Sequence, residues 1–185
     1  MNDILTVAWK EWKELLSWRS SGERGRGGLS MLIMVAVFGV VLPWQMGTDW
    51  VESPLALLSW AWVPILLVSS VIAQAFAGER ERHTLETLLS TRLSDKAILL
   101  GKILAAVTYA WGLTMVSLIV GLVTINVAFG EGRLILYPVE IAVGGAVLTL
   151  LVASTVAAAG TLVSLHASTV RQAQQTLSIV SIVLV

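Results

Sequence analysis

Cysteine is absent from the sequence, and histidine occurs only at His83 and His166. Disulfide bonds and thiolate metal sites are therefore excluded, and two imidazoles are too few for a typical zinc site. Charge is also scarce, because 13% of the residues are Asp, Glu, Lys or Arg whereas 56% are hydrophobic. So few polar side chains cannot cover a soluble surface, and the composition indicates an integral membrane protein. Acidic and basic residues balance at 12 each, which gives no reason to expect a nucleic-acid partner.

Charged residues are absent from four long windows: residues 27–48, 53–78, 103–130 and 141–170. Each window is longer than the roughly 20 residues that a helix needs to cross a bilayer. We therefore predict an all-α fold, a polytopic transmembrane helix bundle. The predicted spans are residues 29–48, 54–77, 103–129 and 139–166, followed by the start of a fifth at 176–185. Because the last uncharged window stops at Val185 without a polar flank, we expect the protein to continue beyond this residue.

The positive charges gather on one side of the predicted spans. With the amino terminus in the cytoplasm, eleven of the twelve Lys and Arg residues are cytoplasmic and only Arg133 lies outside. Lys and Arg are enriched on the cytoplasmic side of membrane proteins. We therefore predict a multi-pass protein of the cell membrane, plasma or inner, with a cytoplasmic amino terminus. Trp44, Trp50 and Tyr137 then fall at the outer boundary, where amphipathic aromatic rings are common.

The region before the first span is amphipathic. Apolar residues recur there at spacings of three and four, which is the pattern of one helix face. They are Leu5, Ala8, Trp9, Trp12, Leu15 and Leu16. Lys10, Lys13, Glu14 and Ser17 fall opposite to them. The pattern predicts an amino-terminal interfacial helix over residues 3–19, lying along the inner headgroups.

A charged stretch at residues 78–102 separates the second and third spans. Thr84, Leu85, Leu88 and Leu89 gather on one side of a predicted helix, and Ser94 is a good cap for the helix that returns to the membrane. We predict a cytoplasmic helix, a turn and a second helix, with an ordinary solvated loop as the alternative. A second, shorter cytoplasmic turn is predicted at residues 167–175, which contain Arg171 and three glutamines.

The sequence of this stretch resembles that of a known family, the ABC-2 type permeases, which are the membrane subunits of ATP-binding cassette transporters. Residues 76–81 read FAGERE, Thr84, Leu85 and Glu86 follow as TLE, and residues 98–102 read ILLGK. Each phrase is similar to the corresponding part of that family. One departure is that the proline often found in the intervening turn is replaced by Arg92 and Leu93.

The resemblance implies one transmembrane permease domain over residues 1–185, and it implies export as the direction of transport. It also implies that residues 78–102 dock on a cytoplasmic ABC ATPase subunit, and that a second permease copy or a related permease completes the transporter. ATP and Mg²⁺ would be bound by the ATPase, with no cofactor on this chain, and the permease would not be an enzyme by itself. The docking residues implied are Glu79, Arg80, Glu81, Arg82, Thr84, Leu85, Glu86, Leu88 and Leu89.

The sequence contains no phosphate-binding loop of the kind that ATPases use. Gly101 and Lys102 are followed by Ile103, so they lack the hydroxyl of a phosphate-binding loop. Within the predicted spans the main amides are Gln74 and Asn126, which we interpret as helix-to-helix hydrogen bonds, with substrate contact as the alternative. No Asp, Glu, Lys or Arg interrupts the uncharged windows, which favours an external ATPase over ion coupling. A secondary transporter component and a non-transporting membrane scaffold remain as alternatives.

Overall fold

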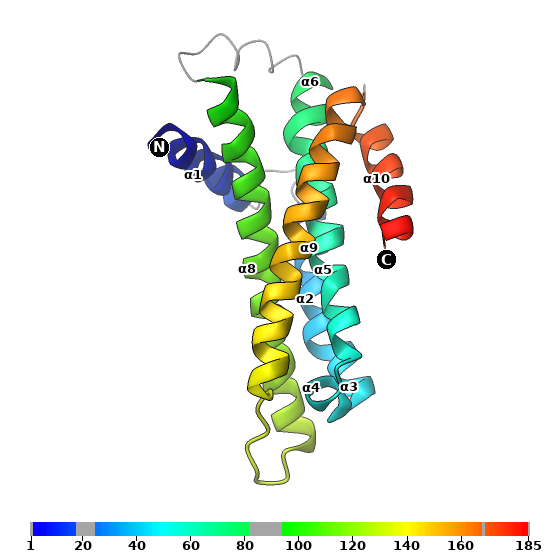
Figure 1. Cartoon of the computed structure of the whole chain (residues 1–185). Coiled ribbons are helices and arrows are strands. Elements are labelled where there is room, and N and C mark those ends of the chain that lie inside the picture. Colours follow the sequence, from blue (N-terminus) through cyan, green and yellow to red (C-terminus); the bar gives the residue numbers. More distant parts are fainter. Residues whose placement is uncertain (1, 18–24, 82–93, 168, 185) are drawn as a thin grey trace.

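The computed structural model describes residues 2–17, 25–81, 94–167 and 169–184, and every regular element in these ranges is a helix (Figure 1). Three helical stretches are long and apolar enough to cross a membrane, namely residues 56–81, 95–129 and 139–166. The prediction of an all-α helix bundle is thereby confirmed for the described part of the chain.

The three stretches form the centre of the bundle. The first consists of α5 (Ala56–Ala73), the π-helix η3 (Gln74–Gly78) and α6 (Glu79–Glu81). The second is α8 (Asp95–Phe129), and the third is α9 (Val139–His166), which covers the same residues as the predicted fourth span. With 35 residues, α8 is about 52 Å long at about 1.5 Å per residue, longer than a bilayer core of about 30 Å.

Small and β-branched side chains pack these three helices together. Ile65, Val68 and Ile72 of α5 are buried against alanines of the other two helices. Ala106 and Ala110 lie on α8, and Ala153 and Ala157 lie on α9. Small residues allow close approach of membrane helices, where van der Waals packing replaces the hydrophobic effect as the source of association. The core therefore lies where α5, α8 and α9 meet.

The predicted first span, residues 29–48, corresponds to three consecutive helical segments packed along α8. They are α2 (Gly25–Ala36), the π-helix η2 (Val37–Val41) and α3 (Leu42–Met46). The short helix α4 (Asp49–Glu52) follows and leads into α5. The described apolar part of these consecutive segments, Met31–Met46, is shorter than the three long helical stretches.

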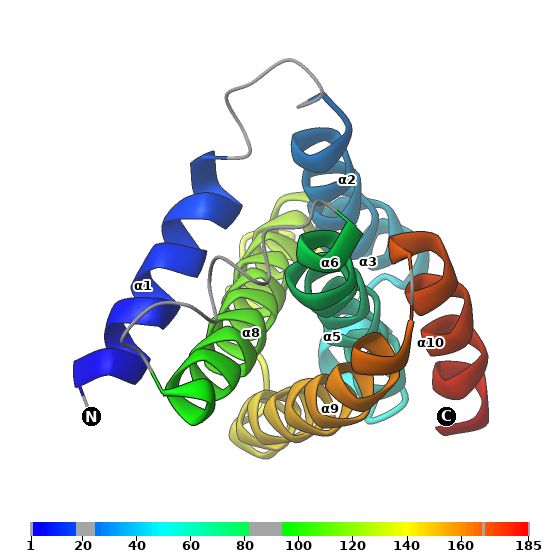
Figure 2. The same ribbon diagram turned by 90° about the horizontal axis from the view of Figure 1, so that it is seen from above.

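The amino-terminal helix α1 (Asn2–Ser17) lies against the first half of α8 (Figures 1 and 2). The crossing is close, since a Cβ built on Gly101 would lie 2.7 Å from Cβ of Val7. Trp12 also donates a hydrogen bond of 2.9 Å to Oγ1 of Thr108. The predicted apolar face of α1 is therefore divided. Trp12 packs on α8, whereas Leu5 and Trp9 are 58% and 64% exposed.

Two boundaries differ from the predicted ones. The predicted turn at 167–175 is largely helical, because α10 (Val170–Leu184) begins at Val170 and the hydroxyl of Thr169 accepts a hydrogen bond from the Gln172 N–H. Helix α10 packs through Ala173 and Leu177 beside α5 and α9. At the other boundary, α8 begins eight residues before the predicted third span. Oγ of Ser94 accepts a hydrogen bond from the Ala97 N–H, as predicted for a cap.

The end of the bundle that contains α3 and α4 is packed with aromatic rings. We call the cluster of Trp50, Trp60 and Tyr137 the aromatic end. The ring centroids of Trp50 and Trp60 lie 6.1 Å apart, and those of Trp60 and Tyr137 lie 5.1 Å apart. Gly145 makes room for this cluster, because a Cβ there would lie 2.4 Å from Cζ3 of Trp60. Shape complementarity holds this end together.

Candidate functional site

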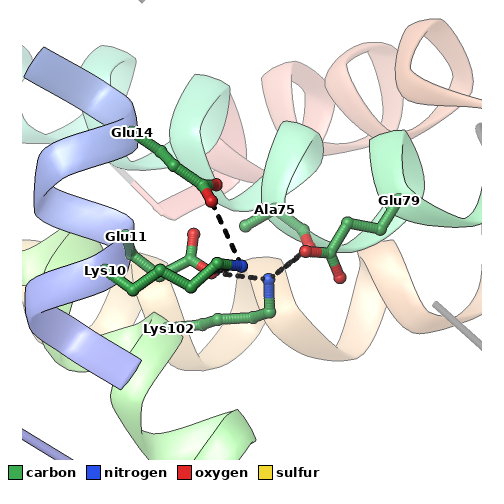
Figure 3. A network of polar contacts seen from close by, with 6 residues as sticks. All are labelled: Lys10, Glu11, Glu14, Ala75, Glu79 and Lys102. Atoms are coloured by element: carbon green, nitrogen blue, oxygen red, sulfur yellow. Dashed lines mark hydrogen bonds and ion pairs between the residues drawn. The ribbon is translucent and has the colours of Figure 1, made fainter. Parts of the chain in front are cut away.

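At the opposite end, α1, η3, α6 and α8 meet around one buried lysine (Figure 3). Lys102 lies on α8, two turns after that helix begins, and its side chain is fully buried. Glu11 reaches it from α1, and Glu79 reaches it from the first position of α6. Lys10 and Glu14 of α1 lie beside them (Figure 3). We call these five charged residues the charged junction.

The ammonium of Lys102 has a full set of acceptors. Nζ donates to Oε1 of Glu79 at 2.6 Å, to Oε1 of Glu11 at 3.0 Å and to the carbonyl oxygen of Ala75 at 3.1 Å. An ammonium has three N–H donors, so these three contacts use all of them. Nζ also lies 5.7 Å from the ring centroid of Phe76, a cation–π distance. The lysine therefore holds side-chain and backbone atoms from three helical elements.

Paired charge explains how the junction tolerates burial. An isolated buried charge is strongly destabilising, but a buried ion pair with additional hydrogen bonds offsets most of its desolvation cost. Lys10 adds a second cation, with Nζ 3.2 Å from Oε1 of Glu14 and 4.0 Å from Oε1 of Glu11. Partial burial alone would lower the pKa of Lys10, but the carboxylates of Glu14, Glu11 and Glu79 outweigh it and raise that pKa. Lys10 therefore stays charged at neutral pH.

Arg80 and Glu81 continue the same end of the bundle toward α9 and α10. The Arg80 guanidinium donates to the carbonyl oxygens of Leu165 and Ala167 at 2.7 and 3.0 Å, where α9 ends. Oε2 of Glu81 accepts a 3.2 Å hydrogen bond from the Val170 N–H, where α10 begins. A cation at a helix carboxyl terminus and an anion at a helix amino terminus both complement the helix dipole. Glu79, Arg80 and Glu81 thus connect α6 to three different partners.

The predicted docking residues are divided between two parts of the chain. Glu79, Arg80 and Glu81 are described, and each contacts another segment of the same chain. The other six lie outside the described residues: Arg82, Thr84, Leu85, Glu86, Leu88 and Leu89.

The two predicted intramembrane amides lie far apart in the structure. Gln74 is half-buried at the first position of η3. Asn126 lies near the aromatic end, where its Oδ1 accepts from the Ile135 N–H and its Nδ2 donates to the Ile135 carbonyl, both at 2.8 Å. The contact is thus between a helix and the following loop, instead of the expected one between two helices. Asn126 fixes the loop that joins α8 to α9.

Sequence reasoning missed Glu11 and Lys102 as partners. Lys102 directly precedes an uncharged window, so the sequence pattern places it at the edge of the third predicted span. The signal that could have revealed it is the position of Lys102 two turns inside the helix that Ser94 caps. Glu11 stands between Trp9 and Trp12, on an α1 face that the apolar pattern did not identify as a contact surface. Among the described residues, no group of three or more His, Asp or Glu side chains is arranged to hold a metal ion.

The chain was compared with known families, curated proteins and solved structures. A family model described as "ABC-2 type transporter" matches residues 2–185. No curated protein and no solved structure matches the chain.

Proposed function

The chain belongs to the ABC-2 type transporter family, and from this premise we propose that it is the permease of an exporter driven by a separate ATPase subunit. Membership makes it a multi-pass membrane protein and the permease component of an ABC transporter, not itself catalytic. The proposal adds the direction of transport, the location in the plasma or inner membrane, and coupling through residues 78–102. ATP and Mg²⁺ are bound by the ATPase in this proposal, and a second permease, identical or related, completes the transporter.

One observation supports coupling through this region. Glu79 precedes residues 82–93 in the chain and Lys102 follows them, and the two side chains form a 2.6 Å ion pair. The same lysine bonds Glu11 of α1 at 3.0 Å. A force applied to residues 82–93 therefore reaches η3, α8 and α1 together instead of bending one helix alone. We place this end on the cytoplasmic side, where the Lys and Arg residues gather.

The docking residues have two roles in this proposal. Glu79, Arg80 and Glu81 hold the base of the docking segment through their contacts with Lys102, α9 and α10. Direct contacts with the ATPase fall to Arg82, Thr84, Leu85, Glu86, Leu88 and Leu89. Leucines on one side of a helix are suited to a hydrophobic groove on a partner.

Affinity purification from native membranes in mild detergent, with partners identified by mass spectrometry, tests the proposal. The expected result is stoichiometric recovery of a protein with a phosphate-binding loop. A double variant, Leu85→Asp with Leu88→Asp, should lose this partner while membrane insertion is retained. The matched control is Leu134→Asp, at a leucine that is 78% exposed in the loop at the opposite end of the bundle.

Either of two results would overturn the proposal. Unchanged ATPase recovery by the double variant would remove the docking assignment. Absence of any ATPase, under conditions that preserve other membrane complexes, would favour the membrane scaffold or the secondary transporter component instead.

A further inference from the structure

Both π-helices of the described chain receive a hydrogen bond from a side chain of α8. In η2, the carbonyl oxygen of Gly39 accepts from Oγ1 of Thr124 at 2.8 Å. In η3, the carbonyl oxygen of Ala75 accepts from Nζ of Lys102 at 3.1 Å. A π-helical turn contains more residues than an α-helical turn, is rare, and is often found at functional sites. A donor from a neighbouring helix is a specific means of stabilising such a turn.

The contacts of Lys102 with η3 extend beyond one carbonyl. Its Nζ lies 5.7 Å from the Phe76 ring centroid, inside η3, and 2.6 Å from Oε1 of Glu79, the residue that follows η3. One buried cation therefore contacts the π-helical turn and the first residue beyond it. These contacts select one rotation of α6 relative to α5.

Conversion of η3 into an α-helical turn would change the direction of every residue after it. One extra residue in a helix rotates the following residues by about 100°, the angle between neighbours in an α-helix. Glu79, Arg80 and Glu81 follow η3 immediately, and each makes a directional contact. A rotation of this size would carry Arg80 away from the end of α9 and Glu81 away from the start of α10.

We propose that Lys102 is a positioning residue that holds η3 in its π-helical register and so fixes the direction in which residues 79–81 leave the bundle. Loss of the Lys102 contacts lets η3 relax to an α-helical turn, and α6 rotates as a unit. The meaning of this register for transport rests on the proposed function. The register itself is a property of this chain and is measured without transport.

Engineered cysteine pairs report the register directly, since the chain has no cysteine of its own. A Cβ on Gly78 would lie 3.4 Å from Cγ2 of Val170, so the pair Gly78→Cys and Val170→Cys is placed to form a disulfide across the end of η3. A Cβ on Gly160 would lie 3.7 Å from Cβ of Ile72, so Ile72→Cys with Gly160→Cys forms a control pair ahead of η3. Both pairs are oxidised in native membranes in the full chain.

The test variant removes the charges of Lys102 and its two carboxylate partners together, as Lys102→Met, Glu11→Gln and Glu79→Gln, so that Lys102 leaves no carboxylate behind without its cation. The 78–170 disulfide yield should fall about tenfold, as expected when a hydrogen bond to a charged group is lost, whereas the 72–160 yield stays unchanged. The matched control is Thr108→Val, which removes the hydrogen bond between Thr108 of α8 and Trp12 and leaves η3 untouched. It should leave both yields unchanged.

A change in the register of η3 can be reversed by deleting one residue, whereas a general loosening of the helix bundle cannot. Deleting Ala75 from the triple variant removes the extra residue of the π-helical turn, so an α-helix then presents residue 78 in its original direction. The 78–170 yield should return to within about twofold of the parent, because removal of one residue reverses a rotation of about 100°. Loosening of the bundle would not be repaired by a deletion.

Three results would overturn the proposal. An unchanged 78–170 yield in the triple variant would mean that Lys102 does not hold the register. Loss of both disulfides would mean that the junction holds the whole bundle together instead of η3. Failure of the Ala75 deletion to restore the yield would mean that no rotation occurred. None of these results depends on an ATPase, so they are distinguishable from failure of the docking proposal.

Discussion

The two ends of the bundle are built from different interactions. At the charged junction, Lys102 of α8 joins α1 and α6 through an ammonium and two carboxylates, with atoms 2.6 to 3.0 Å apart. At the aromatic end, Trp50, Trp60 and Tyr137 pack ring against ring, and Gly145 leaves the space that Trp60 fills. The charged junction is held by directional ion pairs, whereas the aromatic end is held by complementary packing of its rings.

This difference bears on which end changes during transport. Close-packed aromatic side chains have few alternative arrangements, since moving one ring opens a cavity or creates a clash. Charged side chains can exchange one partner for another, provided that each buried charge stays paired. The proposed ATPase contact thus lies at the end built from directional ion pairs and not at the close-packed aromatic end.

Lys102→Met should have the largest effect on stability. It leaves the buried Glu11 and the half-buried Glu79 without their shared cation, and breaking a buried pair in this way costs about 3–5 kcal/mol. Unfolding of the purified protein in detergent should report the loss. The triple variant Lys102→Met, Glu11→Gln and Glu79→Gln should recover most of it, since it removes the unpaired charges. Equal stability of the single and triple variants would refute the view that charge pairing holds this end.

Gly145→Ala should have the next largest effect, at the aromatic end. The new Cβ would lie 2.4 Å from Cζ3 of Trp60, and overpacking of this kind costs about 1–3 kcal/mol. Gly144→Ala is the matched control, because a Cβ there meets no atom within 4 Å. Thermal unfolding of the two variants should separate them clearly. Equal melting temperatures would show that shape complementarity is not what holds the aromatic end.

Thr124→Val should produce a smaller loss. It removes the neutral hydrogen bond to Gly39 in η2, and such a bond is worth about 1 kcal/mol. Thr155→Val on α9 is the control, because the hydroxyl of Thr155 bonds only carbonyls of its own helix, at Leu151 and Val152. Thermal unfolding of the two variants measures the difference. A loss as large as that of Lys102→Met would contradict the contrast between a neutral and a charged contact on a π-helix.

At neutral pH the smallest effect is that of ionisation of Tyr137, which lies in the loop between α8 and α9. Burial raises the pKa of Tyr137 to about 12, against the opposing effect of the Trp50 indole. The neutral phenol is therefore favoured in the folded state. Its contribution to stability is complete below the ordinary pKa of 10.0 and is lost as the pH rises through about 12.

An ultraviolet titration of the phenolate in a Tyr109→Phe background measures Tyr137 alone, since the chain has two tyrosines. A midpoint near pH 10 would show that the aromatic end admits water freely. The same titration in the triple variant of the charged junction should be unchanged, because the two ends are held independently.

The sequence predicted the bundle better than it predicted the junction. Uncharged windows follow directly from the cost of a charge in a bilayer, and the span 139–166, predicted around the window 141–170, has the same bounds as α9. The same rule concealed Lys102, because a window drawn between charges always ends at a charge. A buried ion pair depends on partners 23 and 91 residues away, Glu79 and Glu11, and local pattern carries no signal for such distances.

The π-helices were equally hidden from the sequence. The segment Gln74–Gly78 reads QAFAG and suits an α-helix apart from its glycine, so the wider turn is imposed by tertiary contacts. The orientation of α1 was hidden for a related reason. Apolar residues of α1 can face either lipid or protein, and the pattern does not distinguish the two. It therefore could not show that Trp12 contacts α8 while Trp9 stays exposed.

The order of residues around Lys102 has a consequence for biosynthesis. Glu11 and Glu79 both precede Lys102 in the chain, so a ribosome delivers the two counterions before the cation they neutralise. An unpaired lysine inside a membrane is costly, and chains fold progressively from the amino terminus as they are made. When α8 inserts, Glu11 of α1 and Glu79 of α6 are already present to receive its charge. The junction therefore sets an order of assembly in which α8 enters after α1 and α6 and completes the ion pairs.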